Sequence, residues 1–290
     1  IEDTYSLYIH YDTGHIKIID QEYEQKEKLL SLNYTVNGLE NKNLSEMESD
    51  LSQLEGIEMV VPRLKFGAAV STEDELVQML AWGVEGQKEL QFTNIGRELN
   101  KGRMVEAGKR EVVMGTALLD KIERSVGEKV TMVYTTAFSS FQGANFEIVG
   151  ELESNLPLLN EQVVFMPLDT AQQLLYLNDE ATELLLITAD RDQANNYLAE
   201  VQNYLAQNRG EKYLAQSWKN GNSFIQLLEV SETIYNFIYL FLVLLSSIVV
   251  INTLVMIVKE RTQEIGMMSA LGLKSREILQ LFILEGSAMA

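Results

Sequence analysis

The hydrophobic and polar positions of this chain follow one pattern in its first three quarters and another in its last quarter. Over residues 7–11 and 16–18 apolar and polar residues alternate, which predicts two strands of a hairpin that turns at Gly14. Ser45 and Glu48 have the spacing of a capping box and predict the start of a helix. The first part of the chain is therefore expected to mix strands and helices.

The next apolar stretches predict further strands. Residues 57–61 and 64–71 read as two strands separated by Pro62, because proline has no N–H group to give to a sheet. Residues 72–84 fit two interpretations, since their first residues have the spacing of a helix start and the later ones alternate as in a strand. The residues alone leave this choice open.

A regular succession of strands and helices follows. The middle of the chain, residues 112–152, is rich in strand patterns around one short helix. The elements predicted after it are a strand at 163–166, a helix at 169–177, a strand at 183–189, a helix at 192–208 and a strand at 213–216. A β-α-β-α-β run beside a strand-rich block predicts an α+β domain with two subdomains.

The second pattern is a long apolar run. Residues 234–258 contain no Asp, Glu, Lys, Arg or His, and as a helix they would measure roughly 38 Å, against roughly 30 Å for a hydrocarbon layer. Aromatic residues crowd its first end, and Lys259 and Arg261 follow its other end, as at the two membrane interfaces. The run predicts a transmembrane helix, because buried core helices of this length rarely lack a polar face.

The charge distribution orients that helix. The 23 Lys and Arg against 42 Asp and Glu give a net charge of −19, which argues against a nucleic-acid partner. The whole excess lies in residues 1–233, whereas residues 259–290 carry four basic and four acidic side chains. Basic residues beside a span mark the cytoplasmic side, so we expect the acidic domain outside. Because no signal segment precedes it, we expect an upstream anchor helix beyond this stretch.

Candidate catalytic and metal-binding motifs are weak. Gly102 and Gly108 with Lys109 do not have the spacing of a phosphate loop, and Arg110 occupies the position of its magnesium-binding hydroxyl residue. His10, Asp12 and His15 sit close in sequence, but a solvated hairpin explains them better than a metal site. The absence of cysteine excludes a disulfide framework and a thiol nucleophile. We expect no catalytic, cofactor-binding or metal-binding residue in this chain.

Two segments next to the apolar run have patterns of their own. The stripe before it, residues 222–238, predicts a helix that continues into the membrane as a stalk, and its proposed stalk residues are Phe224, Leu227, Leu228 and Ser231. After the run, Ile265, Met268 and Leu271 form a short apolar edge on a helix that ends with Gly272 at its C′ position. Ser275 is expected to cap the following helix.

This end of the chain resembles a known family. Arg261-Thr262-x-Glu264-Ile265-Gly266, then Ala270-Leu271-Gly272 and Ile278-x-x-x-Phe282-x-x-Glu285-Gly286, are similar to the FtsX-type permease domain of MacB/LolC/LolE-like ABC transporters. Looser matches around residues 115–132, 146–159 and 163–175 extend the resemblance over nearly the whole chain. The resemblance makes the segment after the run a coupling helix on an ATPase, with the coupling residues Arg261, Glu264, Ile265, Gly266, Met268, Ala270, Leu271 and Gly272.

The resemblance also implies an organisation for the chain. It implies an extracytoplasmic domain with Porter-like and Sabre-like subdomains, in which residues 72–84 are a strand. The implied divisions are the extracytoplasmic domain 1–218, the stalk 219–233, the transmembrane helix 234–258, the coupling helix 259–274 and the truncated start of another membrane helix at 275–290. The location implied is the bacterial cytoplasmic (inner) membrane, with the large domain on the periplasmic side.

The function implied is mechanotransmission, in which a cytoplasmic ABC ATPase that holds ATP and magnesium moves the outer domains. A second permease copy or paralogue, membrane lipid, and a lipoprotein or periplasmic adaptor are the other implied partners. Family members handle lipoproteins, peptides or drugs, and we slightly favour lipoprotein release. The alternative is a single-span sensor with an extracytoplasmic ligand-binding domain.

Overall fold

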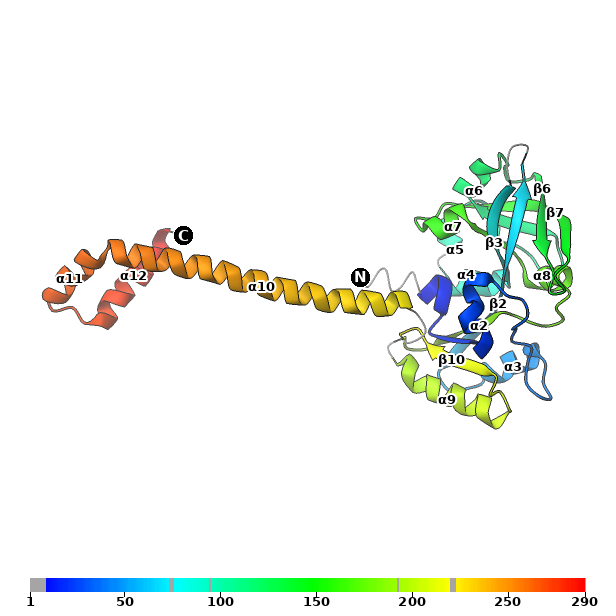
Figure 1. Ribbon diagram of the computed structural model, residues 1–290, viewed down its shortest axis with the longest axis horizontal. Coiled ribbons are helices and arrows are strands. Elements are labelled where there is room, and N and C mark those ends of the chain that lie inside the picture. The colour runs from blue at the N-terminus through cyan, green and yellow to red at the C-terminus, as the bar shows by residue number, and fades with distance from the viewer. Residues whose placement is uncertain (1–8, 73–75, 94, 192, 220–222, 290) are drawn as a thin grey trace. The chain divides into compact units, whose positions relative to one another are not determined.

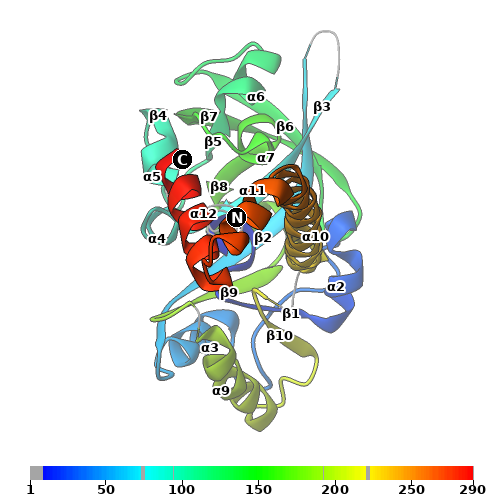
Figure 2. The same ribbon diagram turned by 90° about the vertical axis from the view of Figure 1, so that its left-hand side faces the viewer.

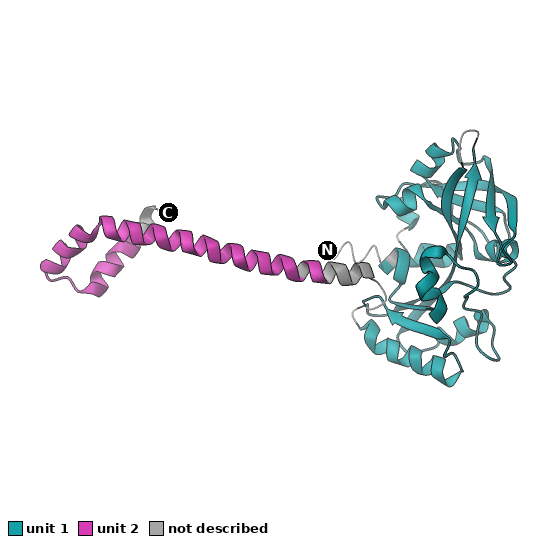
Figure 3. Cartoon of the chain, viewed as in Figure 1, with its two compact units in different colours: residues 1–225 teal, residues 226–290 magenta. Residues whose placement is uncertain are grey.

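The computed structural model covers a chain of 290 residues, and the residues that it describes are 9–72, 76–93, 95–191, 193–219 and 223–289. Two compact units divide the chain, residues 1–225 and residues 226–290 (Figure 3). The first unit is built on a sheet, whereas the described residues of the second unit are helices joined by short turns.

Ten strands in the described residues of the first unit hydrogen-bond into one sheet (Figure 1). They are β1 (Ile16–Asp20), β2 (Ile57–Ser71), β3 (Leu76–Val84), β4 (Leu99–Gly102), β5 (Glu111–Gly115), β6 (Lys129–Thr135), β7 (Phe141–Leu152), β8 (Val163–Pro167), β9 (Glu183–Thr188) and β10 (Tyr213–Ser217). Their order is β10-β1-β9-β2-β3-β8-β5-β7-β4, and β6 pairs with both β2 and β7. Since β6 joins β7 back to β2, the strands β2, β3, β8, β5, β7 and β6 close into a ring, here called the barrel. The strands β10, β1 and β9 extend the sheet from β2 and are called the flank.

Short helices connect these strands. They are the π-helix η1 (Ile9–Thr13), α2 (Gln21–Lys26), the 3-10 turn η2 (Glu27–Leu29), α3 (Leu44–Leu51), α4 (Gly86–Phe92), α5 (Ile95–Glu98), α6 (Thr116–Lys121), α7 (Pro157–Glu161), α8 (Leu168–Leu175) and α9 (Ala194–Gln207). This content confirms the predicted α+β class, including the strands and helices predicted after residue 163. Residue 192, where the last helix was predicted to start, lies outside the described residues.

The barrel encloses its own apolar core. Alternate residues of its strands point inward, because successive side chains of a strand face opposite sides. Phe66 and Tyr134 meet edge to face there with their ring centroids 6.3 Å apart, and Phe146 is buried in the same core. Side chains of α6 and α8 belong to this core as well. The barrel interior is therefore filled by side chains and is not a channel.

The larger apolar core of the flank lies on one of its faces. Ile16 and Ile18 of β1 and Leu184 of β9 pack with buried residues of α3 and α9. Figure 2 shows α3 and α9 beside β1 and β10. On β9 and β1 the alternate residues Glu183 and Lys17 face the other side of the sheet. One face of the flank is thus apolar, and the other carries buried charges beside a small apolar cluster that includes Leu185.

The predicted hairpin at the start of the chain is wrong, although its second strand exists as β1. Residues 9–13 form η1 instead of a strand, and Leu7 lies outside the described residues. The reason is that β1 already pairs with β9 on one edge and with β10 on the other. No edge of β1 is left for a hairpin partner.

The predicted break at Pro62 is also wrong, because β2 runs through it without interruption. The Arg63 carbonyl accepts a 2.9 Å hydrogen bond from the Thr182 N–H, so Arg63 faces β9 and its neighbour Pro62 faces the opposite side. On that side β2 pairs with β3 only from Arg63 onward. The missing N–H of Pro62 therefore costs the sheet no hydrogen bond.

The structure also decides the predictions for residues 72–84 and for the capping box. Residues 72–84 fitted either a helix or a strand, and the structure has the strand β3 there. Residues 73–75 lie outside the described residues. The capping box lies two residues earlier than predicted, at Asn43 and Glu46. Ser45 instead donates a 2.8 Å hydrogen bond to Asp179, and Glu48 pairs with Lys88.

The second unit contains three helices in its described part, the first of which begins just before it. They are α10 (Ser223–Glu260), α11 (Thr262–Ala270) and α12 (Ser275–Met289). In α10 the segment Thr233–Glu260 contains a stretch of 18 residues with a mean hydropathy of 2.7, and it is the one described helix long and apolar enough to cross a membrane. At about 1.5 Å per residue its 28 residues measure about 42 Å, more than the roughly 30 Å hydrocarbon layer of a bilayer.

Candidate functional site

The predicted coupling segment is the helix α11 together with the turns at its two ends. The chain leaves α10 at Glu260 and starts α11 after a single residue, Arg261. The Thr262 hydroxyl donates to the carbonyl groups of Val258 (3.1 Å) and Lys259 (2.8 Å), two of the carbonyls that a helix end leaves unsatisfied. This hydroxyl therefore supplies a donor to carbonyls at the end of α10.

The other end of α11 is closed by glycine, as predicted. Gly272 has φ +95° and follows the C-cap Leu271. The Gly272 N–H donates to the Ser269 carbonyl (3.1 Å) and the Leu273 N–H to the Met268 carbonyl (3.2 Å), which is the Schellman arrangement. This geometry confirms Gly272 at the C′ position and turns the chain into α12.

The start of α12 differs from the prediction. Ser275 is its first helical residue and not its cap. The Lys274 carbonyl accepts the first helical hydrogen bond, from Ile278, and the Lys274 N–H donates to Glu277 at 2.9 Å. A reciprocal bond from the third residue of the helix thus replaces the expected serine cap.

Exposure divides the apolar residues of α11 between two faces. Ile265 and Met268 are partly buried, whereas Met267 and Leu271 are 63% and 81% exposed. The guanidinium of Arg261, on the same face as Ile265 and Met268, lies 5.9 Å from the centre of the Phe282 ring of α12. The apolar edge predicted from Ile265, Met268 and Leu271 therefore has only Leu271 fully exposed.

The exposed face of α11 contains a residue that sequence reasoning missed. Met267 lies four residues before Leu271, and such pairs share one face of a helix. Gly266 and Ala270 belong to the same face, and a Cβ atom added at Gly266 would meet nothing within 4 Å. Glu264 is exposed as well. The i, i+4 spacing of Met267 and Leu271 was the signal that could have identified this face.

The predicted stalk residues all lie in the backbone of α10. Ser231 is half-buried, and the side chains of Phe224, Leu227 and Leu228 lie outside the described part of the structure. The backbone is helical from Ser223 through Glu260, which confirms one helix over the described residues of the stalk and the apolar run. The roles of the stalk residues stay predictions.

The first and last strands of the first unit are hydrogen-bonded neighbours. β1 pairs antiparallel with β10, and Ile16 lies opposite Ser217. One residue further out, the Trp218 N–H donates to the His15 carbonyl at 3.1 Å. The Trp218 indole N–H also donates to the Arg191 carbonyl at 3.3 Å. The first and last strands of this unit are therefore paired, and Trp218 extends the pairing by one residue.

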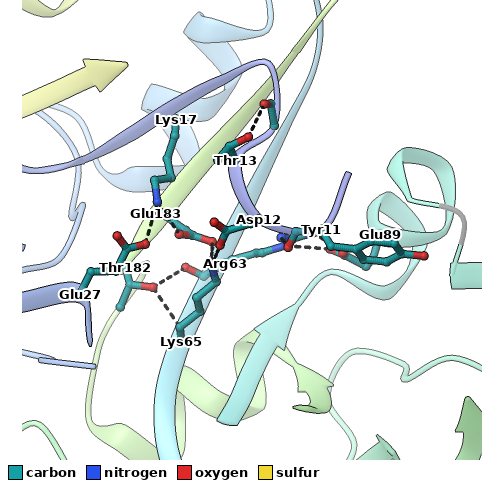
Figure 4. Close-up of polar contacts among 11 residues, drawn as sticks. Tyr11, Asp12, Thr13, Lys17, Glu27, Arg63, Lys65, Glu89, Thr182 and Glu183 are labelled. Carbon is teal, nitrogen blue, oxygen red and sulfur yellow. Dashed lines mark hydrogen bonds and ion pairs between the residues drawn. The ribbon is translucent and has the colours of Figure 1, made fainter. Parts of the chain in front are cut away.

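A buried ion network covers the charged face of the flank beside η1 (Figure 4). Arg63 and Glu89 of α4 are fully buried and form an ion pair, with Arg63 Nε 3.3 Å from Glu89 Oε2. Arg63 Nη1 donates to the Tyr11 carbonyl of η1 at 2.6 Å. The guanidinium also lies 5.2 Å from the Trp82 ring centre. Such pairing offsets the cost of burying the charge.

Lysine side chains complete the network. Lys65 Nζ lies 2.9 Å from Glu183 and 3.0 Å from Asp12 of η1, and Lys17 Nζ lies 2.7 Å from Glu27. Burial by itself would lower the pKa of Lys65, but the carboxylates of Glu183 and Asp12 outweigh it and leave that pKa raised. The pKa of Lys17 is raised for the same combination of causes, chiefly Glu183. These lysines therefore stay charged inside the domain.

Two sequence interpretations concern residues of this region. Asp12 binds Lys65 and His15 Nδ1 accepts from the Thr188 N–H at 2.9 Å, while the side chain of His10 lies outside the described residues. Among the residues that the structure describes, no three His, Cys, Asp or Glu side chains are grouped to hold a metal ion. Asp12 and His15 thus bind the segment around η1 and β1 to β2 and β9.

The fold and these segments define a class: a large α+β domain joined to a helix that can cross a membrane and to a short helical hairpin. The chain matches the MacB-like periplasmic core domain over residues 14–204 and the FtsX-like permease C-terminal domain over residues 236–290. The chain belongs to the FtsX-like permeases of the MacB/LolC family, as the motifs around Arg261 and Gly272 indicated.

The chain is also similar to individual proteins. The lipoprotein-releasing system transmembrane protein LolC of Neisseria meningitidis serogroup B is 20% identical over 240 residues, which is 80% of this chain and 57% of that protein. The chain therefore spans little more than half the length of this curated relative. The periplasmic region of MacB from Actinobacillus actinomycetemcomitans has the same fold, with a TM-score of 0.50 at 12% identity over 76% of this chain and 95% of that one. The extracellular domain of the noncanonic ABC-type transporter YknZ from Gram-positive bacteria gives a TM-score of 0.49 at 16% identity, over 70% and 99% of the two chains.

Proposed function

We propose that this chain is the permease subunit of an ATP-driven transporter in which ATP hydrolysis in the cytoplasm moves the extracytoplasmic first unit. The observation that carries the proposal is α10, a single helix from Ser223 to Glu260 that is followed after one residue by α11. A continuous helix transmits a push or a tilt, whereas a flexible linker absorbs it. Membership of the FtsX-like permeases supports the same mechanism.

In this proposal α11 docks on a separate cytoplasmic ABC ATPase, which holds ATP and magnesium and performs all of the chemistry. The exposed face with Gly266, Met267, Ala270 and Leu271 supports docking, because exposed apolar side chains on a short helix suit a cleft on a partner. The opposite face with Ile265 and Met268 would hold α11 against α12. This chain would contribute no catalytic residue.

The transporter is proposed to lie in the bacterial inner membrane with the first unit on the periplasmic side and a second permease copy or paralogue beside it. The acidic charge of residues 1–233 and the basic residues Lys259 and Arg261 directly after the apolar run support this orientation. We further propose that the barrel and the flank are the two subdomains, Porter-like and Sabre-like. Their separate apolar cores support that division.

For the substrate we propose a lipoprotein that the transporter releases from the membrane. The support is the LolC relative, at 20% identity, and a peptide or a drug-like compound is the competing substrate class. Against a single-span sensor, we propose that α12 is the start of a second membrane segment. The support is the turn at Gly272 that leads into α12 and the apolar residues of α12 between Ile278 and Leu284.

The docking proposal can be tested in the full-length protein with its ATPase. Met267→Asp with Leu271→Asp should abolish co-purification of the ATPase and ATP-dependent transport, because each apolar side chain contributes about 1.5–3 kcal/mol when fully buried. Ser269→Asp adds a negative charge to α11 outside the face of Met267 and Leu271, removes no apolar surface and should leave binding intact. Normal ATPase binding by the double variant would contradict the proposed docking face.

A further inference from the structure

The strand β2 belongs to the barrel and to the flank at once, and it changes neighbours at one residue. Up to Arg63 it pairs with β9 of the flank, and from Arg63 onward it pairs with β3 of the barrel. Arg63 is the residue common to both ladders, opposite Glu183 on one side and Val84 on the other. Pro62 comes directly before it and can donate no backbone hydrogen bond. The pairing of β2 with the flank and its pairing with the barrel therefore overlap at Arg63 alone, directly after Pro62.

Beyond the end of the β2–β9 ladder, side chains link β2 to the flank. Lys65 lies two residues past the last β2–β9 pair and already opposite Trp82 of β3. Its backbone N–H donates to the Thr182 hydroxyl at 2.9 Å instead of to a backbone carbonyl of the flank. Its ammonium group reaches back to Glu183 of β9 at 2.9 Å. A barrel residue is therefore bound to the flank by its side chain.

The chain segment that enters the unit takes part in the same contacts. Asp12 of η1 lies 3.0 Å from Lys65 Nζ, and the Tyr11 carbonyl accepts from Arg63 (Figure 4). η1 is thus held to β2 at the change of neighbours by two side chains, and not by strand pairing. A displacement of η1 would act directly on Arg63 and Lys65.

The carboxylate of Glu183, at the centre of the network, is bound by ion pairs and not by well-aligned hydrogen bonds. Glu183 is fully buried, yet neither of its oxygens accepts a well-aligned hydrogen bond within the described part of the chain. Its partners are the ammonium groups of Lys65 at 2.9 Å and Lys17 at 3.9 Å. Attraction between charges falls slowly with distance and depends little on angle, whereas hydrogen bonds are directional. Such a contact tolerates a change of angle better than a ladder of hydrogen bonds.

We propose that Lys65, Glu183 and Asp12 form an ionic brace that sets the angle between barrel and flank about Pro62–Arg63, and that η1 adjusts this brace. The part played by η1 rests on the proposed function, since it assumes that movement at the membrane reaches the start of the domain. The brace itself does not depend on transport. Barrel and flank change their angle when the brace is altered, and each keeps its own apolar core.

The test measures the angle directly in the full-length protein in lipid nanodiscs. This 290-residue stretch has no cysteine, so spin labels can be attached through Lys129→Cys in the barrel and Glu200→Cys on α9, two exposed positions outside the network. Double electron–electron resonance then gives the distance distribution between the labels. Lys65→Met should broaden and shift this distribution. Lys101→Met, which removes the Lys101–Glu151 pair (2.8 Å) between β4 and β7 away from Pro62–Arg63, should leave it unchanged.

A second variant keeps the test decisive where Lys65→Met prevents folding by leaving Glu183 short of a partner. Lys65→Met with Glu183→Gln removes both charges, and it should fold and show the same broadened distribution. A native distribution in either folded variant overturns the brace. Asp12→Asn should broaden the distribution less, and a native result there overturns the role of η1. A broadened distribution in Lys65→Met without ATP-dependent transport by the wild type would reject the proposed function and leave the brace standing.

Discussion

The first unit buries apolar side chains and strong charges alike, whereas the second unit exposes most of its apolar side chains. Arg63, Glu89 and Glu183 are fully buried in the first unit and are matched by charges on neighbouring elements. In the second unit, large apolar residues of α10 from Val230 to Val258 are about half exposed or more, and the hydroxyls of Ser247 and Thr253 donate to carbonyls of their own helix. The first unit therefore pairs its buried charges internally, and the second unit needs a surrounding apolar phase or a partner to cover its apolar side chains.

This difference predicts that the two units, expressed separately, differ sharply in solubility. Residues 1–219 expressed alone should be soluble, monomeric and cooperatively folded, because the apolar cores of barrel and flank lie within them. Residues 220–290 expressed alone should require detergent or lipid. Size-exclusion chromatography and urea unfolding followed by circular dichroism give the measurement, and an aggregated first fragment would contradict the comparison.

Breaking a buried ion pair should be the most damaging single change in the first unit. Arg63→Leu leaves Glu89 buried without its partner and should lower the free energy of unfolding by about 3–5 kcal/mol. Urea unfolding of residues 1–219, followed by the fluorescence of Trp82 and Trp218, reports on this unit. Arg209→Leu removes the exposed pair with Glu40 and should change stability by about 0–1 kcal/mol. Equal losses in the two variants would rule out burial as the cause.

Softening α10 should affect transport and leave the first unit intact. A Gly-Gly-Gly insertion after Ser231 weakens the helix by about 0.8–1 kcal/mol per glycine relative to alanine and creates a hinge. We expect loss of ATP-dependent transport, with native urea unfolding of the first unit and normal membrane insertion. An Ala-Ala-Ala insertion at the same point keeps the helix stiff and is the matched control, so it should be milder. Transport at the normal rate by the triglycine variant would exclude stiff coupling through α10.

The smallest expected effect separates two glycines of the coupling segment. Gly272→Ala puts a side chain at φ +95° and should destabilise the turn between α11 and α12 by about 1–2 kcal/mol. Gly266→Ala lies inside α11 in open space and should stabilise that helix by about 0.8–1 kcal/mol. Hydrogen exchange of the amides in α11, measured in nanodiscs, should accelerate in the first variant and slow in the second. Two effects of the same sign would argue against the turn geometry.

Local patterns were sufficient for much of the fold. Alternation predicted β1, β8, β9 and β10 to within about two residues, and the Gly272 turn followed from one glycine after a short amphipathic stretch. The errors came from information that is not local. Pro62 reads as a strand break unless it is known that the pairing of β2 with β3 starts one residue later, at Arg63. Residues 7–11 read as a strand unless both edges of β1 are known to be paired.

The candidate sites divide in the same way. The coupling helix follows from sequence motifs near Arg261 and Gly272, but which of its faces is exposed depends on packing against α12. The ion network had no sequence signal, since Lys65 lies 53 residues from Asp12 and Arg63 lies 26 residues from Glu89. In a chain with many charged residues, the sequence does not indicate which of them form ion pairs, because the fold decides which ones meet.

The pairing of β1 with β10 has a consequence for how such permeases can diversify. Ile16 lies opposite Ser217, so the first and last strands of the first unit are neighbours in its sheet. A domain whose outermost strands lie side by side tolerates insertion into, or exchange within, a longer chain. Related permeases could therefore exchange this sheet as one folded piece.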